Sequence, residues 1–489
     1  MAKSEQLFEL IKSLGKSEKR YFRLFSSMQA GEKIYTKLFD AIEKQKTYNE
    51  DDLLKQFKSE SFIKRFAMAK NYLYNLILKS MDLCHYNADI SKELSNLLKQ
   101  ADFLYQKKLI KHYTKLLKKI KKKALEAEQF NFCLEVSERE RRLLSNLPYS
   151  KKLKEDIQKC FDEHDEYLKK YNNLNQYLFY DAQLHFLEKQ YKSQKDKTDL
   201  KKNIDKLIAD DIFMNESQAL SFNAIYKYYE IKAEYYWIKE DYNESYKYRA
   251  ALISYVESQE DYLGNKLNFY IPALYNFVNI CNHLEKYENV LEGIKKIRTS
   301  IDLKKATTQQ TLIYLNTFGM KLSTCWILKE FDVGNKIAKE AEQILNHPLF
   351  STYIYPKLII RVAIASFYFN SKQYDEALDA INDALNDPAL KTYNQLHYHA
   401  RILNLLIHFE LGNLFLLDSE IKSTYRFFKE IDMYGKKEKY LFNFLKHYND
   451  LLSKKEKHNL YSSLEANLED TTNLKNPFYD YKEWIASKK

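Results

Sequence analysis

From about residue 90 onward, apolar side chains recur at helical spacing almost everywhere, and short polar turns interrupt them. The clearest stretch is residues 364–388, IASFYFNSKQYDEALDAINDALNDP. This pattern predicts two amphipathic helices joined by a short turn. Only eight glycines and six prolines are scattered through the 489 residues, and sheet folds need more of both for their tight turns. We therefore predict an all-α fold.

One order of residue types marks this helix pair. A small residue and an aromatic residue lie in the first helix, and an aromatic, a small, a large and a small residue follow in the second. In chain order they are Ala365, Tyr368, Tyr374, Ala377, Ile381 and Ala384. Small residues let two helices approach closely, and aromatic rings fill the wedge between successive pairs. The order resembles the tetratricopeptide (TPR) repeat, and the chain is similar to bacterial TPR-like proteins. The resemblance implies a right-handed superhelical array of antiparallel helix pairs.

The same order recurs four more times at a longer spacing than in the common repeat. The small position of the second helix falls at residues 245, 290, 334, 377 and 417, so the intervals are 45, 44, 43 and 40 residues. The commonest tetratricopeptide repeat is about 34 residues long. Arg249 and His408 stand where the pattern expects other residue types. Counting back in steps of about 44 residues predicts an early pair over residues 97–120 and two further pairs before residue 245, with breaks near Pro148 and residues 195–199.

We divide the chain into four regions. Residues 1–90 form a basic helical N-terminal region, and residues 91–210 form early basic helical repeats. Residues 211–432 form the TPR-like repeats. Residues 433–489 form C-terminal capping helices, which an array needs because its last pair would otherwise expose an apolar face.

The net charge of +11 lies entirely in the first 150 residues. Residues 1–90 have 16 basic and 12 acidic side chains, residues 91–150 have 14 and 7, and residues 151–489 have 48 of each. The excess centres on one predicted helix, KKLIKHYTKLLKKIKKK at residues 107–123. Its apolar stripe matches that of the preceding helix, so we do not expect it to insert into a membrane. Its lysines form either a solvated outer face or a basic patch for an acidic partner or nucleic acid. They are Lys107, Lys108, Lys111, Lys115, Lys118, Lys119, Lys121, Lys122 and Lys123.

Residues 50–80 permit a helix-turn-helix interpretation. In it, a long helix from Phe62 presents basic residues to DNA. The turn KSES lacks the glycine usual in this motif, and apolar residues along the helix favour packing instead. The basic residues are Lys64, Arg65, Lys70 and Lys79.

Sequence motifs for catalysis, metals and cofactors are missing. No glycine lies within three residues of another, which excludes phosphate-binding loops and dinucleotide fingerprints. The five cysteines are at least 27 residues apart, and His397 and His399 would point in different directions on a helix, so neither set predicts a metal site. We expect no cofactor and no enzymatic activity. The amino terminus is charged from Lys3 onward and lacks the apolar core of a signal peptide, which predicts a cytoplasmic protein.

The resemblance to tetratricopeptide proteins implies a partner-binding groove lined by first helices. In that family the contacts come from positions three before, one after and four after the small residue. An asparagine at such a position suits an extended peptide, because one amide offers both a donor and an acceptor. Tryptophans at this spacing are alternatively core residues. The implied residues are Glu230, Glu234, Trp237, Tyr275, Asn279, Asn282, Ser323, Trp326, Ser366 and Phe369.

The fifth pair gives only apolar residues at these positions, Ile402, Leu406 and Phe409, and we expect the terminal helices to seal them. The sequence thus predicts a non-catalytic scaffold that binds a peptide or partner protein in a TPR-like groove. The alternative is a nucleic-acid-associated or regulatory protein that docks through its basic first 150 residues.

Overall fold

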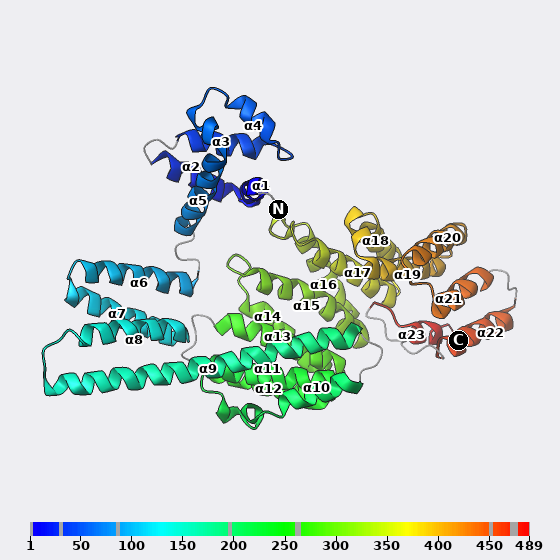
Figure 1. Ribbon diagram of the computed structural model, residues 1–489. Coiled ribbons are helices and arrows are strands. Elements are labelled where there is room, and N and C mark those ends of the chain that lie inside the picture. The colour runs from blue at the N-terminus through cyan, green and yellow to red at the C-terminus, as the bar shows by residue number, and fades with distance from the viewer. Residues whose placement is uncertain are drawn as a thin grey trace. The chain divides into compact units, whose positions relative to one another are not determined.

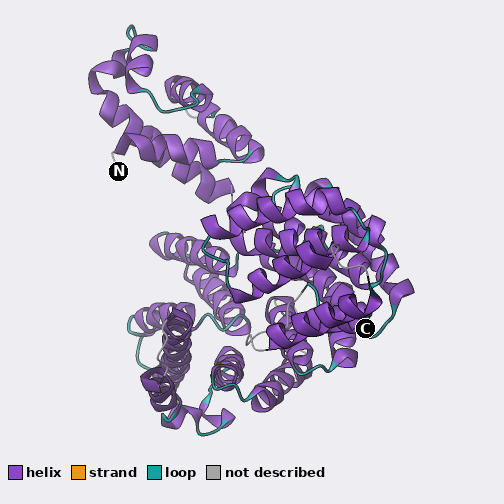
Figure 2. Cartoon of the chain, turned by 90° about the vertical axis from the view of Figure 1, so that its right-hand side faces the viewer, coloured by secondary structure: helices purple, strands orange, loops and turns teal. Residues whose placement is uncertain are grey.

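The computed structural model describes residues 3–28, 33–84, 89–193, 198–259, 266–448, 453–469 and 478–488. Within these ranges the regular structure is helical and no strand occurs, so the predicted all-α fold is confirmed (Figure 2). The chain divides into two compact units. The N-terminal unit contains residues 1–176 and 220–223, and the C-terminal unit contains residues 177–219 and 224–489. Among the described helices, none is both long enough and apolar enough to cross a membrane.

The N-terminal unit begins with five helices around one apolar cluster that includes Phe22, Phe39 and Ile77. Asn49 caps the fourth helix by accepting a hydrogen bond from the Asp52 amide at 3.2 Å. The predicted helix from Phe62 begins as a 3-10 helix at Ser61–Arg65, and its α-helical part starts at Phe66. The helices are α1 Lys3–Ser13, α2 Lys16–Ser27, α3 Lys33–Lys44, α4 Glu50–Gln56 and α5 Phe66–Cys84.

The early repeat is present, but two regular pairs do not follow it. Helix α7 (Ile110–Glu126) packs against both α6 (Ile90–Gln106) and α8 (Phe130–Leu144), and it buries Tyr113 and Leu117. The predicted break near Pro148 is present, between α8 and α9. Two further pairs would also need a turn after it, but the chain there forms the 43-residue helix α9 (Lys151–Ser193). Residues 151–193 contain neither glycine nor proline, so nothing in them ends a helix. Of the second predicted break, residues 194–197 lie outside the described residues, and α10 begins at Thr198.

The C-terminal unit contains the five predicted helix pairs, which run from green to orange in Figure 1. The small position of each first helix is buried: Ala233, Val278, Leu322, Ala365 and Leu405 are all at most 1% exposed. In chain order the pairs are α11 Phe222–Ile238 with α12 Tyr242–Ser258, α13 Lys266–His283 with α14 Tyr287–Ser300, α15 Thr308–Ile327 with α16 Phe331–Leu345, α17 Ile354–Asn370 with α18 Tyr374–Leu385, and α19 Asn394–Glu410 with α20 Leu414–Glu430.

The same three-residue turn joins the two helices of every pair. Its middle residue has a φ of about 60–70°, and this residue is Glu240, Glu285, Lys329, Lys372 or Gly412. The amide of the third residue donates back into the first helix, as from Gln373 to the Tyr368 carbonyl at 2.8 Å. Four of the five turns place a side chain in a conformation that favours glycine. The helix packing on either side therefore fixes the turn, since its residue types do not.

The terminal helices cover the end of the array. They are α21 Lys436–His447, α22 Lys454–Glu469 and α23 Tyr481–Ala486. The ring of Phe409 packs against Phe444 at 5.6 Å and against Trp484 at 5.7 Å, measured between ring centroids. The prediction that the terminal helices seal the fifth pair is thus confirmed at Phe409.

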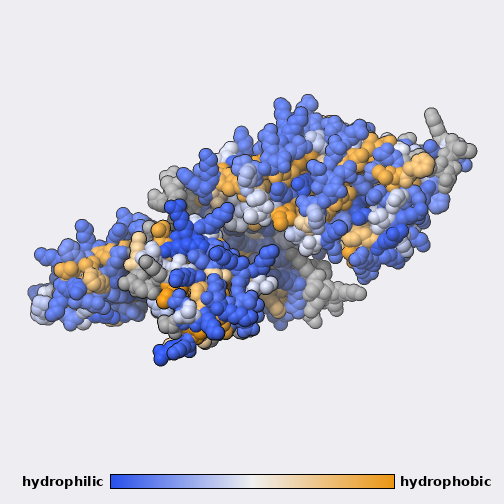
Figure 3. Space-filling model, turned by 90° about the horizontal axis from the view of Figure 1, so that it is seen from above, coloured by the Kyte–Doolittle hydropathy of each residue, from blue (hydrophilic) through white to orange (hydrophobic). Residues whose placement is uncertain are grey.

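The surface of the protein is mainly hydrophilic on the face that Figure 3 shows, and smaller hydrophobic patches lie between the hydrophilic residues.

Two histidines in α19 face different neighbours. His397 is buried, and its Nε2 accepts a hydrogen bond from Arg401 at 3.0 Å. His399, two residues on, packs its ring against Phe478 and Tyr479. Burial is the main cause that lowers the pKa of each imidazole to about 4.

Close contact between neighbouring pairs depends on glycine at one position. An ideal Cβ built on Gly334 in α16 would lie 2.1 Å from Cε2 of Phe367 in α17. Phe367 is itself only 1% exposed, so its ring has no free space to move into. Gly319 in α15 differs, because the nearest atom to its ideal Cβ is the Ala363 Cβ at 3.7 Å.

We predict that Gly334→Ala lowers the free energy of unfolding by about 1–3 kcal/mol, because the added methyl overpacks the contact with Phe367. Urea unfolding followed by circular dichroism measures this. Gly319→Ala is the matched control and should be neutral or stabilising by up to about 1 kcal/mol, since alanine favours a helix. In a Phe367→Leu background, Gly334→Ala should cost less than it does in the wild type, because the smaller side chain leaves room for the methyl. If both glycine variants lose stability equally, the close contact is not the cause.

We predict that His397 makes the protein less stable in acid. The folded-state pKa lies below the value of about 6.5 in the unfolded chain, so the unfolded chain binds more protons as the pH falls from about 6.5 to 4. The loss should reach about 2 kcal/mol at pH 5. His397→Gln should remove this part of the difference between unfolding at pH 7 and at pH 5, whereas the control His458→Gln, on an exposed part of α22, should keep it. An unchanged pH dependence in His397→Gln would contradict the prediction.

Candidate functional site

The chain's own C-terminal segment covers a face of α17 that includes the predicted groove residue Ser366. The Ser366 hydroxyl donates a hydrogen bond to the Phe478 carbonyl, and the Asn370 amide donates to the same oxygen at 3.3 Å. Further along, the Trp484 indole donates to Glu410 at 2.7 Å, and Lys329 pairs with Glu483. First-helix side chains of α17 and α19 thus hold a main-chain carbonyl and an aromatic side chain of another segment.

This segment explains why two predicted groove residues are not free. Ser366 is 7% exposed because it lies under Phe478. Phe369 is 3% exposed and packs against Tyr374, so it is a core residue. The covering segment lies more than 100 residues further along the chain, and the repeat pattern says nothing of it.

Four of the predicted residues meet at a cavity of about 330 Å³ between the first and second pairs. Glu234 and Trp237 come from α11, and Asn279 and Asn282 come from α13. The two helices present these side chains because each set recurs at three- or four-residue spacing on one helix face. The complete lining is Glu234, Trp237, Arg249, Asn276, Asn279, Ile280, Asn282 and His283.

An ion pair forms one wall of this cavity. Arg249 donates to Glu234 at 3.2 Å, and both side chains are largely buried. Burial raises the pKa of the Glu234 carboxyl, and the charge of Glu188 adds to the rise, whereas Arg249 and His185 oppose it. The Nε of Arg249 is buried without a hydrogen-bond partner. The Nε–H of Arg249 therefore remains an unused hydrogen-bond donor beside the Arg249–Glu234 ion pair.

Three asparagine amides of α13 line the same cavity. The side chains of Asn276, Asn279 and Asn282 make no hydrogen bond with any part of the chain that the structure describes. All three are partly exposed. Each amide keeps a donor and an acceptor available, which is the complement of a peptide main chain. The Trp237 ring, packed against Tyr242 and His283, adds an apolar surface.

Two side chains that line this cavity stand at the same repeat positions as the two α17 side chains that contact Phe478. Asn279 stands at the position of Ser366, one residue after the small residue of its first helix. His283 likewise stands at the position of Asn370. The two positions that hold the Phe478 carbonyl in the fourth pair are thus polar, and line a cavity, in the second pair.

The remaining predicted groove residues do not join this cavity. Glu230 pairs with Lys227 at 2.8 Å, and the Tyr275 hydroxyl accepts a hydrogen bond from Asn316 at 3.2 Å. Ser323 donates to the Met320 carbonyl of its own helix. Trp326 is 9% exposed and belongs to the apolar core, so the alternative interpretation of this tryptophan applies.

Arg249, Asn276 and His283 line the cavity although the groove positions did not include them. The sequence contained one indication of the role of Arg249: it breaks the repeat pattern at a position in the second helix. A buried cation needs a partner, so such a break points to a polar site. Asn276 completes a run of asparagines at three-residue spacing with Asn279 and Asn282, and this run was visible in the sequence.

The basic patch on α7 and the turn before it is only partly neutralised. Burial disfavours the Lys121 ammonium, but hydrogen bonds to Glu140 and Glu163 outweigh it and raise the pKa of Lys121. Lys123 pairs with Glu93 at 2.6 Å, and Lys122 lies 3.8 Å from Glu126. The other six are exposed and have no carboxylate within 4.0 Å among the described residues: Lys107, Lys108, Lys111, Lys115, Lys118 and Lys119.

The basic residues of the helix-turn-helix interpretation do not share one surface role. Lys70 is 8% exposed and pairs with Glu50 at 2.6 Å, so it stabilises the contact between α5 and α4. Lys64, Arg65 and Lys79 are exposed. Lys64 and Arg65 lie in the 3-10 helix, before the long helix begins.

Within the described ranges, no three His, Cys, Asp or Glu side chains lie close enough together to hold a metal ion. Cys133, Cys160, Cys281 and Cys325 are buried free thiols, and Cys84 is partly exposed. Burial is the first cause that raises the pKa of Cys133 and of Cys281, each to about 12.

Comparison with known proteins adds no relative. No protein-family model, no curated protein and no solved structure matches this chain.

Proposed function

We propose that this protein is a non-catalytic, cytoplasmic scaffold whose TPR-like repeats bind an extended peptide segment of a partner protein between α11 and α13. One observation supports it above the others: Ser366 and Asn370 hold the Phe478 carbonyl of the chain's own C-terminal segment. The equivalent positions of the second pair, Asn279 and His283, line a cavity that this segment does not fill.

The chemistry of the cavity suits a main chain. The free amides of Asn276, Asn279 and Asn282 offer donors and acceptors to successive peptide groups, as extended-peptide recognition requires. Glu234 and Arg249 already neutralise each other, so the cavity has little need of a charged ligand. Trp237 provides a surface for an apolar side chain of the peptide.

We predict that Asn279→Ala/Asn282→Ala weakens peptide binding about 30-fold. Each lost hydrogen bond contributes about 1 kcal/mol, so the pair contributes about 2 kcal/mol. Random 12-residue peptides displayed on phage are selected on the full chain, and the Kd of synthetic copies is measured by fluorescence anisotropy.

Asn443→Ala, an exposed position on α21, is the control and should bind the peptides like the wild type. Circular dichroism checks that each variant keeps its helix content. If no selected peptide binds the wild type more tightly than the double variant, these two amides do not form a peptide site.

A second candidate function rests on the basic patch. Six of its lysines are exposed without a carboxylate within ion-pair distance in the described chain, and four of them, Lys111, Lys115, Lys118 and Lys119, lie on the single helix α7. We propose as the alternative that this patch docks on a nucleic-acid backbone. Lysines alone provide phosphate contacts without base recognition, so the binding would be independent of sequence.

We predict for this alternative that the Kd for a labelled 20-base-pair DNA rises about 100-fold between 50 and 200 mM salt, the change expected for about four phosphate contacts. Changing the four α7 lysines to glutamate should abolish binding. The matched control changes Lys295, Lys336, Lys339 and Lys446 to glutamate, which alters the net charge equally. If both variants lose binding alike, or if the wild type does not bind at 50 mM salt, the alternative fails.

A further inference from the structure

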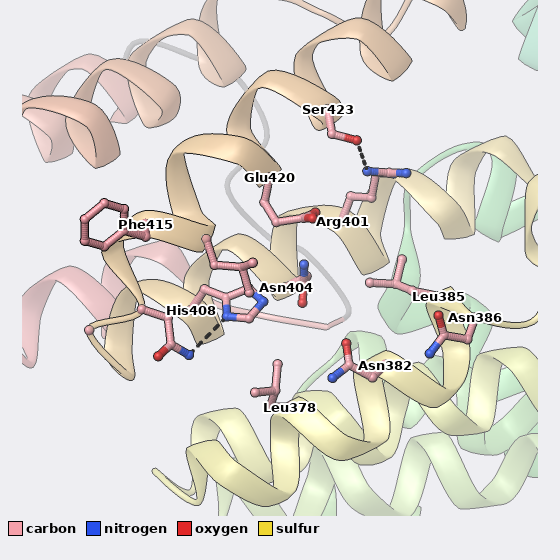
Figure 4. A pocket seen from close by; sticks show the side chains of 13 residues that line it. Leu378, Asn382, Leu385, Asn386, Arg401, Asn404, His408, Phe415, Glu420 and Ser423 are labelled. Atoms are coloured by element: carbon pink, nitrogen blue, oxygen red, sulfur yellow. Dashed lines mark hydrogen bonds between the residues drawn. The ribbon is translucent and has the colours of Figure 1, made fainter.

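A second cavity, of about 760 Å³, lies between α18 and α20 and reaches down to α19. Figure 4 shows polar side chains from all three helices facing this space. The cavity between α11 and α13 lies against two first helices. This second cavity lies between two second helices, because α18 and α20 belong to the fourth and fifth pairs.

Arg401 has no ion-pair partner among the described residues that line this cavity. Its Nε donates to His397 at 3.0 Å and its Nη1 donates to Ser423 at 3.1 Å, so the guanidinium is fixed in place. No carboxylate of the described chain lies within 4.0 Å of it, although Glu420 lines the same cavity and its charge acts on Arg401 from a longer distance. Burial lowers the pKa of Arg401, and Glu420 only opposes this. A half-buried cation without a counterion favours an anionic ligand.

Amides surround this guanidinium. Asn382 and Asn386 are exposed at the cavity and make no side-chain hydrogen bond with described residues. Asn404 is 4% exposed, and its Oδ1 is buried without a partner. An unsatisfied buried oxygen costs free energy that a ligand or water donor would recover.

The rim of the cavity is apolar and fully accessible. Phe415 is 100% exposed and Leu416 is 50% exposed, both in the first turn of α20. Exposed aromatic residues beside a polar cavity are typical of surfaces that anchor a protein partner. A small polar metabolite would fill the cavity but leave this rim uncovered.

We propose that the cavity between α18 and α20 is a second docking site, which binds an acidic segment of a partner protein. A carboxylate of the segment binds Arg401, its main chain bonds to the asparagine amides and to Glu420, and an adjacent large apolar side chain covers Phe415 and Leu416. Charge complementarity selects this occupant, because a neutral segment leaves Arg401 without a counterion.

Selection isolates this site from the groove. Random 12-residue peptides are selected on the full chain carrying Asn279→Ala/Asn282→Ala, and binders are counter-selected on the same chain with Arg401→Gln added. We expect the enriched peptides to contain Asp or Glu next to a large apolar residue. Replacing that acid by its amide should weaken binding about 10- to 100-fold, as should Arg401→Gln.

A double-mutant cycle completes the test. The amide peptide should lose little further affinity for Arg401→Gln, because both changes remove the same ion pair. Phe415→Ala, at a fully exposed position that cannot disturb the fold, should weaken binding at least fivefold and gives a second variant if Arg401→Gln unfolds. The wild-type chain should bind these peptides no more tightly than the chain with Asn279→Ala/Asn282→Ala. The proposal is overturned if no acidic peptide survives the counter-selection, or if the surviving peptides bind Phe415→Ala as tightly as the parent.

Discussion

Each helix pair in the C-terminal unit buries its apolar face only by packing against the next pair. The contact is close enough that Gly334 accommodates the Phe367 ring of the following pair, and the Ser245 hydroxyl donates to the Ala233 carbonyl within its own pair at 2.8 Å. Such packing fixes the spacing of the helices and forces residues into the left-handed turns between them. It also leaves the last pair uncovered, which is why the C-terminal segment has to fold back.

That return of the chain links stability to recognition. Phe478, Tyr481 and Trp484 cover the last pairs, and hydrogen bonds from Ser366 to the Phe478 carbonyl and from the Trp484 indole to Glu410 hold them there. Polar groups at those positions would cost free energy if they were buried in an apolar core without hydrogen-bond partners. The same positions of the second pair remain polar and line a cavity. Equivalent positions of the repeat are therefore covered in the fourth pair and line a cavity in the second.

The sequence predicted the helix pairs well, because small and aromatic residues at fixed offsets report local packing directly. It failed for α9, where a repeat length was counted through a stretch that contains no residue able to end a helix. It placed Glu234, Trp237, Asn279 and Asn282 together, but not the burial of Ser366. That burial depends on a contact 112 residues away, and no local pattern records it. Trp326 shows the complementary error, since a helical offset alone does not distinguish groove from core.

The two departures from the repeat, Arg249 and His408, line the α11–α13 cavity and the α18–α20 cavity, respectively. A polar residue in a packing position is tolerated where the neighbouring space is polar, so a break in the pattern is itself informative. The cavities then differ in charge. Arg249 pairs with Glu234, whereas Arg401 has no carboxylate within 4.0 Å among the described residues. Since residues 151–489 have equal numbers of basic and acidic side chains, the difference arises from local placement and not from net charge.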